Sequence, residues 1–190
     1  MSKRFALLAT AAALAFAVVA PAPVVYAQMA EKTVTVGGAP MYPSKNIIQN
    51  AVNSKDHTTL VAAVKAAGLV DTLEGPGPFT VFAPTNEAFA KLPPNTVPML
   101  LQADNKPTLI KVLTYHVVPG RLSAADLMAE VQAGGGKASL ITVEGEPLIV
   151  TSDGQALVLT DAKGGMSRIT IADVNQSNGV IHVVDTVLMP

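Results

Sequence analysis

The chain has 190 residues, a formal net charge of −1 and no cysteine. The missing cysteine excludes disulfides, thiol catalysis, thiolate metal sites and a lipid-modified cysteine anchor. The nearly balanced charge offers no basic stripe for phosphate groups, so we expect neither nucleic acid nor an anionic membrane surface as a partner.

The first 27 residues have the layout of a signal peptide. Lys3 and Arg4 precede an uncharged apolar run from Phe5 to Ala20, and Val25-Tyr26-Ala27 suits a cleavage site. The apolar run is shorter than the roughly 20 residues that a membrane-spanning helix needs, so we expect cleavage after Ala27 and no membrane span afterwards. The mature chain would then have 163 residues and a net charge of −3, and we expect it to be exported to the periplasm or the outside.

Residues 28–43 are interpreted as a leader, followed by helices. Within the leader, Thr33 to Val36 alternates like a short strand, and Gly37 to Pro40 is expected to end it. Ser44 is expected to cap a first helix, and Asp56 is expected to cap a second helix that ends at Gly68.

The middle of the chain predicts one strand and three more helices. Phe79 to Phe82 follows a Gly/Pro-rich stretch and is typical of a buried strand. Thr85 is expected to cap the next helix, and Asn105, with a proline two residues later, to open another. Ser123 and Asp126 have the spacing of a capping box.

From residue 138 onward the pattern changes to short β-branched runs separated by Gly, Pro, Asp or Asn. These runs are Leu140 to Glu144, Leu148 to Thr151, Ala156 to Thr160, Ile169 to Val174 and Val180 to Val184. The short turns between them indicate antiparallel hairpins. The sequence therefore predicts an α+β fold, with a mostly antiparallel sheet or sandwich covered by helices in one domain at residues 44–190.

Three segments resemble the motifs of a known family. Gly77 to Phe89, Tyr115 to Val118 and Asn178 to Pro190 look like the first motif, the tyrosine-histidine motif and the second motif of the fasciclin family, in that family's order and spacing. The chain resembles its small secreted bacterial single-domain members. This resemblance implies a wedge-shaped antiparallel β-sandwich with flanking α-helices.

The resemblance also implies a function, namely a non-catalytic adhesion or interaction module. Its expected partners are proteins or components of an envelope, matrix or host-cell surface. In matrix-associated animal relatives, an Asp-Ile pair and the tyrosine-histidine segment have been linked to integrin binding. The matching positions here are Asp173-Val174 and Tyr115-His116, which become the candidate partner contacts.

The other motif residues are expected to be structural, because apolar strand residues, helix caps and turn residues usually serve the fold. They are Thr80, Phe82, Pro84, Thr85, Asn86, Phe89, Asn178, Gly179, His182 and Asp185. Both His116 and His182 lie in β-branched runs, which favours buried, hydrogen-bonded imidazoles over metal ligands. Asp173 is expected to be an exposed charge beside a turn.

Known enzyme signatures are not matched. Gly134-Gly135-Gly136-Lys137 lacks both the first glycine and the final Ser/Thr of a phosphate loop, and there is no Gly-x-Ser-x-Gly or His-Glu-x-x-His pattern. We therefore expect no enzyme activity, no metal and no cofactor. The alternative hypothesis is a periplasmic carrier of a small apolar ligand, held in a pocket between the helices and the sheet.

Overall fold

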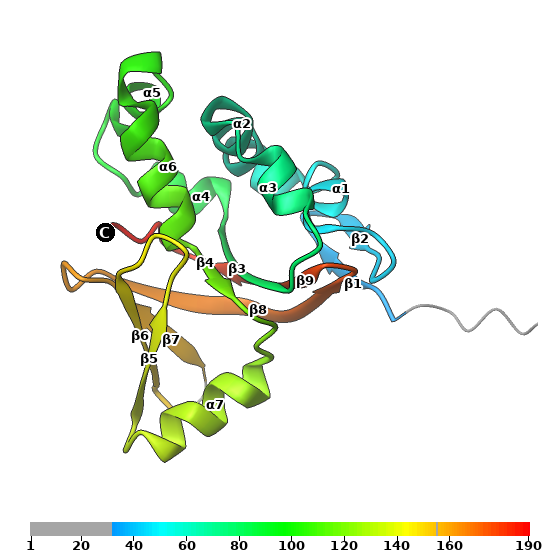
Figure 1. Ribbon diagram of the computed structural model, residues 1–190, viewed down its shortest axis with the longest axis vertical. Coiled ribbons are helices and arrows are strands. Elements are labelled where there is room, and N and C mark those ends of the chain that lie inside the picture. Colours follow the sequence, from blue (N-terminus) through cyan, green and yellow to red (C-terminus); the bar gives the residue numbers. More distant parts are fainter. Residues whose placement is uncertain (1–31, 155) are drawn as a thin grey trace, which may run out of the picture. The chain divides into compact units, whose positions relative to one another are not determined.

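The computed structural model describes residues 32–154 and 156–190 (Figure 1). The prediction of a signal peptide at residues 1–27 lies outside these residues. Within the described part, no helix is long and apolar enough to cross a bilayer. The strands are β1 (Val34–Val36), β2 (Ala39–Met41), β3 (Phe79–Pro84), β4 (Val117–Pro119), β5 (Lys137–Ile141), β6 (Pro147–Ser152), β7 (Leu157–Thr160), β8 (Met166–Gln176) and β9 (Gly179–Val184).

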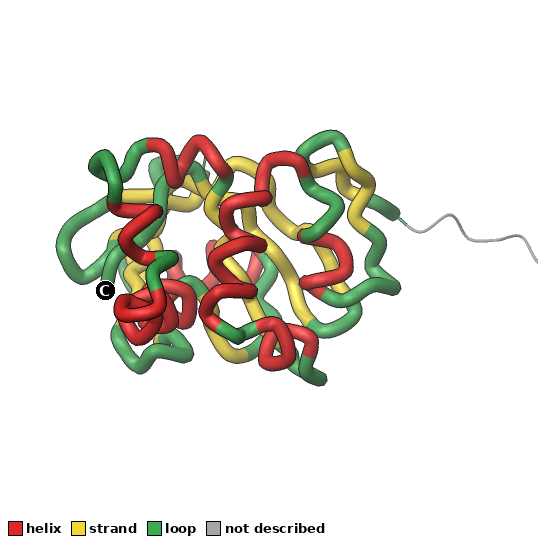
Figure 2. Tube along the Cα trace, turned by 90° about the horizontal axis from the view of Figure 1, so that it is seen from above, coloured by secondary structure: helices red, strands yellow, loops and turns green. Residues whose placement is uncertain are grey.

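Most helices lie between β2 and β4. The α-helices are α1 (Ile47–Ala51), α2 (Thr58–Ala67), α3 (Val70–Glu74), α4 (Asn86–Ala90), α5 (Thr96–Leu100), α6 (Lys106–Tyr115) and α7 (Ala124–Ala133). Two short 3-10 helices, η1 (Lys55–His57) and η2 (Ala103–Asn105), precede α2 and α6. In Figure 2 the larger group of helices is seen in front of the strands.

The described part opens with a two-stranded hairpin that the sequence predicted only in part. β1 pairs antiparallel with β2, and Val34 lies opposite Met41. Gly37 and Gly38 have φ angles of 59° and 75°, so they turn the chain back instead of ending the strand. Val36 and Met41 are buried in the same core as the helices, and contacts group residues 31–190 into one compact unit.

Seven strands form one sheet in the order β4-β3-β9-β8-β7-β6-β5. The predicted antiparallel arrangement is confirmed for every neighbouring pair except β3 and β9, which are parallel. A parallel pair needs a long crossover connection, and here the chain between the two strands supplies it. Both strands are almost wholly buried, as expected for strands that are covered on two faces.

The two faces of the central strands pack into different cores because side chains alternate along a strand. Val81 and Ile181 belong to the core beneath α1, α2, α3 and α6. Phe82 and Val184 belong to the core that contains α7 and the inner face of β5–β7. The long strand β8 contributes to both cores, and its pairing with β9 is irregular between Ile169 and Val174.

Helix starts show where local patterns succeed and fail. Thr85 caps α4 by accepting the Ala88 N–H, and Ser123 forms the predicted capping box with Asp126. The predictions for Ser44 and Asp56 are wrong. Asn46 caps α1 in a capping box with Gln49, and Asp56 lies inside η1.

The first turn of α2 is capped by a side chain from elsewhere in the chain. The Oδ1 atom of Asn86 accepts hydrogen bonds from the Thr59 N–H (3.0 Å) and the Thr58 hydroxyl (3.1 Å), while its Nδ2 donates to the Lys55 carbonyl (2.8 Å). The helix ends at Gly68 in a left-handed conformation, as predicted.

Candidate functional site

Motif residues of β3 and α4 hold neighbouring segments in place. Thr80 is fully buried, and its hydroxyl donates to the Gly120 carbonyl (2.8 Å) and accepts the Leu122 N–H (2.9 Å). Phe82 is also fully buried and stacks on the ring of His182, with the ring centroids 5.8 Å apart. Pro84 ends β3, and Phe89 is buried against Val112 and Val187.

Asn178 joins three segments that are distant in sequence. Its Oδ1 accepts the Ile47 N–H (3.0 Å), and its Nδ2 donates to the carbonyls of Leu73 (2.8 Å) and Gly75 (2.9 Å). The next residue, Gly179, lies so close to β3 that an added Cβ would overlap the Phe79 carbonyl. Both residues thus fix the entry into β9.

The tyrosine-histidine pair is buried at the end of α6. The Tyr115 hydroxyl donates to the Pro147 carbonyl (3.0 Å) and accepts the Ala162 N–H (3.2 Å), and burial raises its pKa. His116 donates from Nδ1 to the Val112 carbonyl (2.8 Å) and accepts the Leu188 N–H at Nε2 (3.0 Å). Burial lowers the pKa of His116 to about 4, so the imidazole is neutral at pH 7.

His182 links β9 to the start of α7. Its Nε2 donates to the Leu122 carbonyl (2.9 Å), its Nδ1 accepts the Asp173 N–H (3.3 Å), and burial lowers its pKa. Asp173 has a positive φ of 58° and is half-buried, and its Oδ1 accepts the N–H of Ala124, the first residue of α7 (2.8 Å). Asp173 therefore anchors the helix.

The four candidate partner contacts do not form an exposed surface. Tyr115, His116 and Val174 are at most 3% exposed, and the half-buried Asp173 carboxylate bonds to backbone. The expectation that Asp173 is an exposed charge is wrong, because its carboxylate caps α7. A role of these residues in partner binding stays a prediction. In this structure they would affect binding indirectly, by positioning the segments to which they are hydrogen-bonded.

Asp185 also serves the fold. Its Oδ1 accepts the Arg168 N–H (2.9 Å) and the Thr186 hydroxyl (3.0 Å), and its other oxygen lies 3.6 Å from the Lys91 ammonium. These bonds tie the end of β9 to β8 and to the end of α4.

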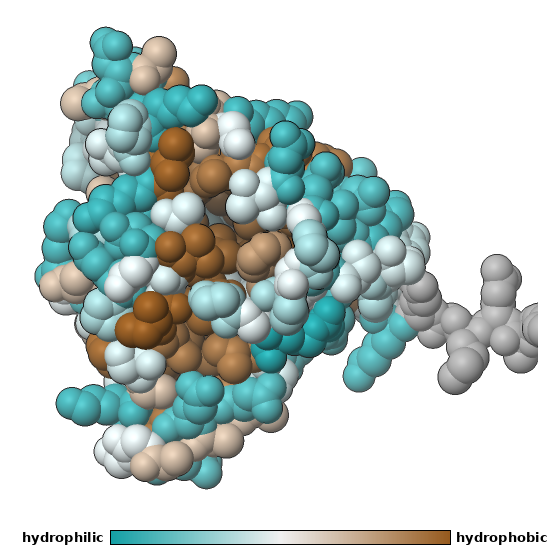
Figure 3. All heavy atoms as spheres, in the orientation of Figure 1, coloured by the Kyte–Doolittle hydropathy of each residue, from teal (hydrophilic) through white to brown (hydrophobic). Residues whose placement is uncertain are grey.

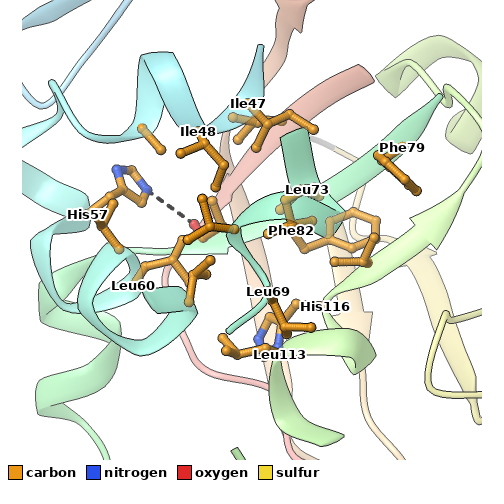
Figure 4. Close-up of a pocket in the computed structure, with 18 of the residues that line it drawn as sticks. Ile47, Ile48, His57, Leu60, Leu69, Leu73, Phe79, Phe82, Leu113 and His116 are labelled. Carbon is orange, nitrogen blue, oxygen red and sulfur yellow. Dashed lines mark hydrogen bonds between the residues drawn. The ribbon is translucent and has the colours of Figure 1, made fainter. Parts of the chain in front are cut away.

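An apolar pocket of about 80 Å³ lies between the helices and the sheet (Figure 4). Its wall combines side chains from α1, α2, α3 and α6 with side chains from β3, β8 and β9. Ile48, Leu60, Leu69, Leu73 and Leu113 are among the lining residues. The sequence analysis anticipated a pocket of this kind in its alternative hypothesis, but it named none of these residues.

A second feature was missed by the sequence analysis. Apart from Lys137 and Arg168, which end one cross-strand row, the outward side chains in the cross-strand rows of β5–β8 are apolar or carry a hydroxyl group. They form a face, here called the outer face, at the strand positions between the buried ones. Its residues are Ser139, Ile141, Pro147, Ile149, Thr151, Val158, Thr160 and Met166, all of them exposed or half-buried. Strict alternation in Lys137 to Ile141 could have revealed it.

One serine–histidine pair borders the pocket, and its geometry is structural. The Ser54 hydroxyl lies 2.8 Å from Nδ1 of His57, whose Nε2 faces the Ala83 carbonyl at 3.4 Å. Both residues are buried, and the nearby Lys55 N–H is used by the Gly37 carbonyl. The His57 N–H likewise donates to the Ser54 carbonyl, so neither of these two N–H groups is free to stabilise a developing oxyanion. Among residues 32–154 and 156–190, no three His, Asp or Glu side chains gather as a metal site.

Comparisons with known proteins agree with the fold. The sequence model of the fasciclin domain matches residues 55–190. Protein sll1483 of Synechocystis is 45% identical over 84% of this chain and 82% of its own length. Immunogenic protein MPB70 of Mycobacterium bovis is 37% identical over 74% of this chain and 66% of its own.

Two larger proteins extend the comparison. Transforming growth factor-beta-induced protein ig-h3 of Sus scrofa is 36% identical over 76% of this chain, which spans only 20% of that protein. The solved structure of a FAS1 domain pair from the insect cell adhesion molecule fasciclin I superposes with a TM-score of 0.70, over 78% of this chain and 52% of that one, at 20% identity. With a family match over more than half of its length and a relative that aligns over most of both chains, this chain belongs to the fasciclin domain family.

Proposed function

We propose that the chain is an exported, non-catalytic module that binds a protein or surface component of an envelope, matrix or host cell. Family membership supports the general class, since fasciclin domains occur in adhesion proteins and in mycobacterial antigens. The proposal adds export and a binding surface. The observation that carries it is the outer face of β5–β8.

The outer face has the composition of a binding surface. The side chains of Ile141 and Met166 are 59% and 67% exposed, although both are large and apolar. Cross-strand pairing sets Ser139 opposite Ile149, which in turn lies opposite Thr160, so that these side chains share one face. Apolar groups that remain exposed together mark an interaction site.

The charges around this face leave its centre neutral. Lys137 and Arg168 lie at its ends, and the Arg168 guanidinium is 2.5 Å from an Asp153 carboxylate oxygen. An uncharged centre with a polar rim is the arrangement found in protein interfaces. A partner with an apolar, weakly charged surface fits it.

The pocket is too small to support the alternative hypothesis of a carrier. A pocket of about 80 Å³ is well below the roughly 300–1,000 Å³ of sites that enclose a drug-sized ligand. We therefore do not propose that the domain encloses a whole carried molecule.

The test compares two variants of the mature chain, each with one exposed apolar side chain replaced by a charge. Ile141→Glu lies in the outer face, and Met99→Glu lies on α5, where the side chain is 54% exposed. Binding of immobilised protein to fractionated envelope and host-surface extracts is measured by surface plasmon resonance. We expect saturable binding that falls at least about tenfold in Ile141→Glu, because a buried unpaired charge opposes the interface, and persists in Met99→Glu.

Equal binding by wild type and Ile141→Glu, with both proteins folded, would reject the outer face as the surface. Absence of saturable binding to any fraction would reject the proposed function itself.

A further inference from the structure

The polar side chains that line the pocket between the helices and the sheet and are buried or half-buried already have hydrogen-bond partners. Ser54 bonds to His57, and His57 faces the Ala83 carbonyl. The Thr114 hydroxyl donates to the Ile110 carbonyl (2.8 Å), and both nitrogens of His116 are paired with backbone. A group that enters the pocket therefore finds no free partner at these residues, which favours hydrocarbon over a polar ligand.

Lys65 is the charged residue of the lining, since both histidines are neutral at pH 7. It lies on α2 and is exposed, and it forms no ion pair with any residue of the described part. Near the surface the lining also includes the apolar Val61, Leu69 and Val143 and the uncharged Thr72. The pocket thus joins an apolar interior to one positive charge.

Apolar side chains surround this interior and are also found at the surface between the helices (Figures 3 and 4). In Figure 4, Leu69, Leu73 and Leu113 point toward the same space as Ile48 and Phe82. In Figure 3, apolar side chains reach the surface between the helices.

We propose that this pocket binds the end of a medium-chain aliphatic carboxylate, with its hydrocarbon tail between the helices and the sheet and its carboxylate at Lys65. The volume of about 80 Å³ is roughly half of the ~150 Å³ cavity that admits benzene, so the enclosed part takes only the last few carbons. This site is separate from the outer face and does not depend on the proposed function.

The first experiment is calorimetric titration of the mature chain with hexanoate, octanoate and decanoate, and with decan-1-ol as a neutral analogue. Each methylene that leaves water is worth about fourfold in affinity, so we expect affinity to rise by at most this factor per methylene and to level off once added methylenes lie outside the enclosed volume. Because the chain has no tryptophan, a single introduced tryptophan also gives an unobstructed fluorescence signal.

Two matched pairs of variants locate the site. Val61→Trp narrows the pocket, whereas Ala62→Trp adds the same ring at the neighbouring exposed position, which is not part of the lining. Lys65→Gln removes the charge at the pocket, and Lys137→Gln removes an exposed charge from β5. We expect Val61→Trp to abolish decanoate binding and Lys65→Gln to weaken it about fivefold, the effect of losing one partly exposed ion pair.

Thermal melts in the absence of ligand identify any variant that does not fold. If Val61→Trp does not fold, the comparison of Lys65→Gln with Lys137→Gln still tests the site. The proposal is overturned if wild type gives no saturable decanoate binding, or if Ala62→Trp loses binding as fully as Val61→Trp. It is also overturned if decan-1-ol shows the same dependence on Lys65 as decanoate, because the carboxylate would then have no role.

Discussion

At the scale of single residues, the buried histidines are neutral groups that fasten strands and helices together. His116 joins Val112 to Leu188, and His182 joins Asp173 to Leu122. In each ring one nitrogen accepts a backbone N–H, which requires that nitrogen to be unprotonated. A proton added to either ring would oppose the existing hydrogen bonds.

This arrangement predicts a loss of stability in mild acid. An unfolded histidine titrates near pH 6.5, whereas His116 in the fold titrates at about 4, so between these values the unfolded state binds the additional proton. Stability is therefore present above pH 6.5 and falls as the pH drops to about 4, by roughly 3 kcal/mol for His116. The lowered pKa values of His57 and His182 act in the same direction.

Urea unfolding at half-unit steps from pH 7.5 to 4 measures this change. In His116→Gln the dependence on pH should be shallower than in wild type, although the variant is less stable at pH 7 because it loses buried hydrogen bonds. A wild-type free energy of unfolding that stays constant from pH 6.5 to 5 would contradict the assignment of neutral buried rings.

A second prediction uses two substitutions of Asp173 to separate the effect of its negative charge from that of its hydrogen bond and backbone conformation. Asparagine keeps the Oδ1 acceptor for the Ala124 N–H and tolerates a positive φ, whereas alanine does neither. We expect Asp173→Ala to lose about 1–3 kcal/mol of stability and Asp173→Asn to lose less than about 1 kcal/mol.

Chemical denaturation of both variants checks the stability, and the partner-binding assay is then run on Asp173→Asn. Full binding by this folded, uncharged variant is expected, since the carboxylate faces α7. Loss of its binding would restore Asp173 as a direct contact.

At the scale of elements, sequence patterns located most helices and strands but not the side chains that tie them together. The β-branched run from Val180 to Val184 and the capping box at Ser123 are local signals, and both elements are present. The cap of α2 was missed because Asn86 lies 27 residues beyond Thr59, and no local pattern records that proximity. The parallel pairing of β3 and β9 was missed for the same reason.

At the candidate site, too, local sequence patterns did not reveal contacts between segments that are distant in sequence. Turn chemistry predicted a structural role for Asn178, and the structure adds the distant backbone groups to which it bonds. The β-branched run around His116 favoured a buried ring, but the hydrogen-bond partners of Tyr115 and His116 could not be obtained from local patterns, because they depend on which segments cover the pair. Pro147 and Leu188, which bond to this pair, come from β6 and from the end of the chain.

The distant cap of α2 can be tested directly. Asn86→Ala removes the acceptor for two groups at the first turn and the donor to Lys55, so we expect a loss of about 1–2 kcal/mol. Hydrogen exchange should accelerate most at the Thr59 amide, whose bond is lost.

Asn53→Ala is the matched control, because Asn53 is exposed and its amide bonds only locally, to the Gln49 carbonyl. Unchanged protection at Thr59 in Asn86→Ala would show that α2 does not depend on this cap.

At the scale of the whole molecule, the central strands join two cores into one structure. Val81 and Phe82 are neighbours in β3 but belong to different cores, and the same holds for Val183 and Val184 in β9. Neither core can lose its strands without disturbing the other. Since the chain has no cysteine, no disulfide holds the two halves together.

This continuity predicts one cooperative unfolding transition for the mature chain. Leu127→Ala removes a fully buried side chain on α7 in one core, and Val64→Ala removes a buried side chain on α2 in the other. We expect losses of about 2–5 kcal/mol for the leucine and somewhat less for the smaller valine. In each variant the whole domain should unfold at a lower urea concentration, with far-ultraviolet circular dichroism and tyrosine fluorescence giving the same midpoint. Two separate midpoints in Leu127→Ala, with the α2 side unfolding at the wild-type concentration, would show instead that the cores on the two faces of β3 and β9 unfold independently.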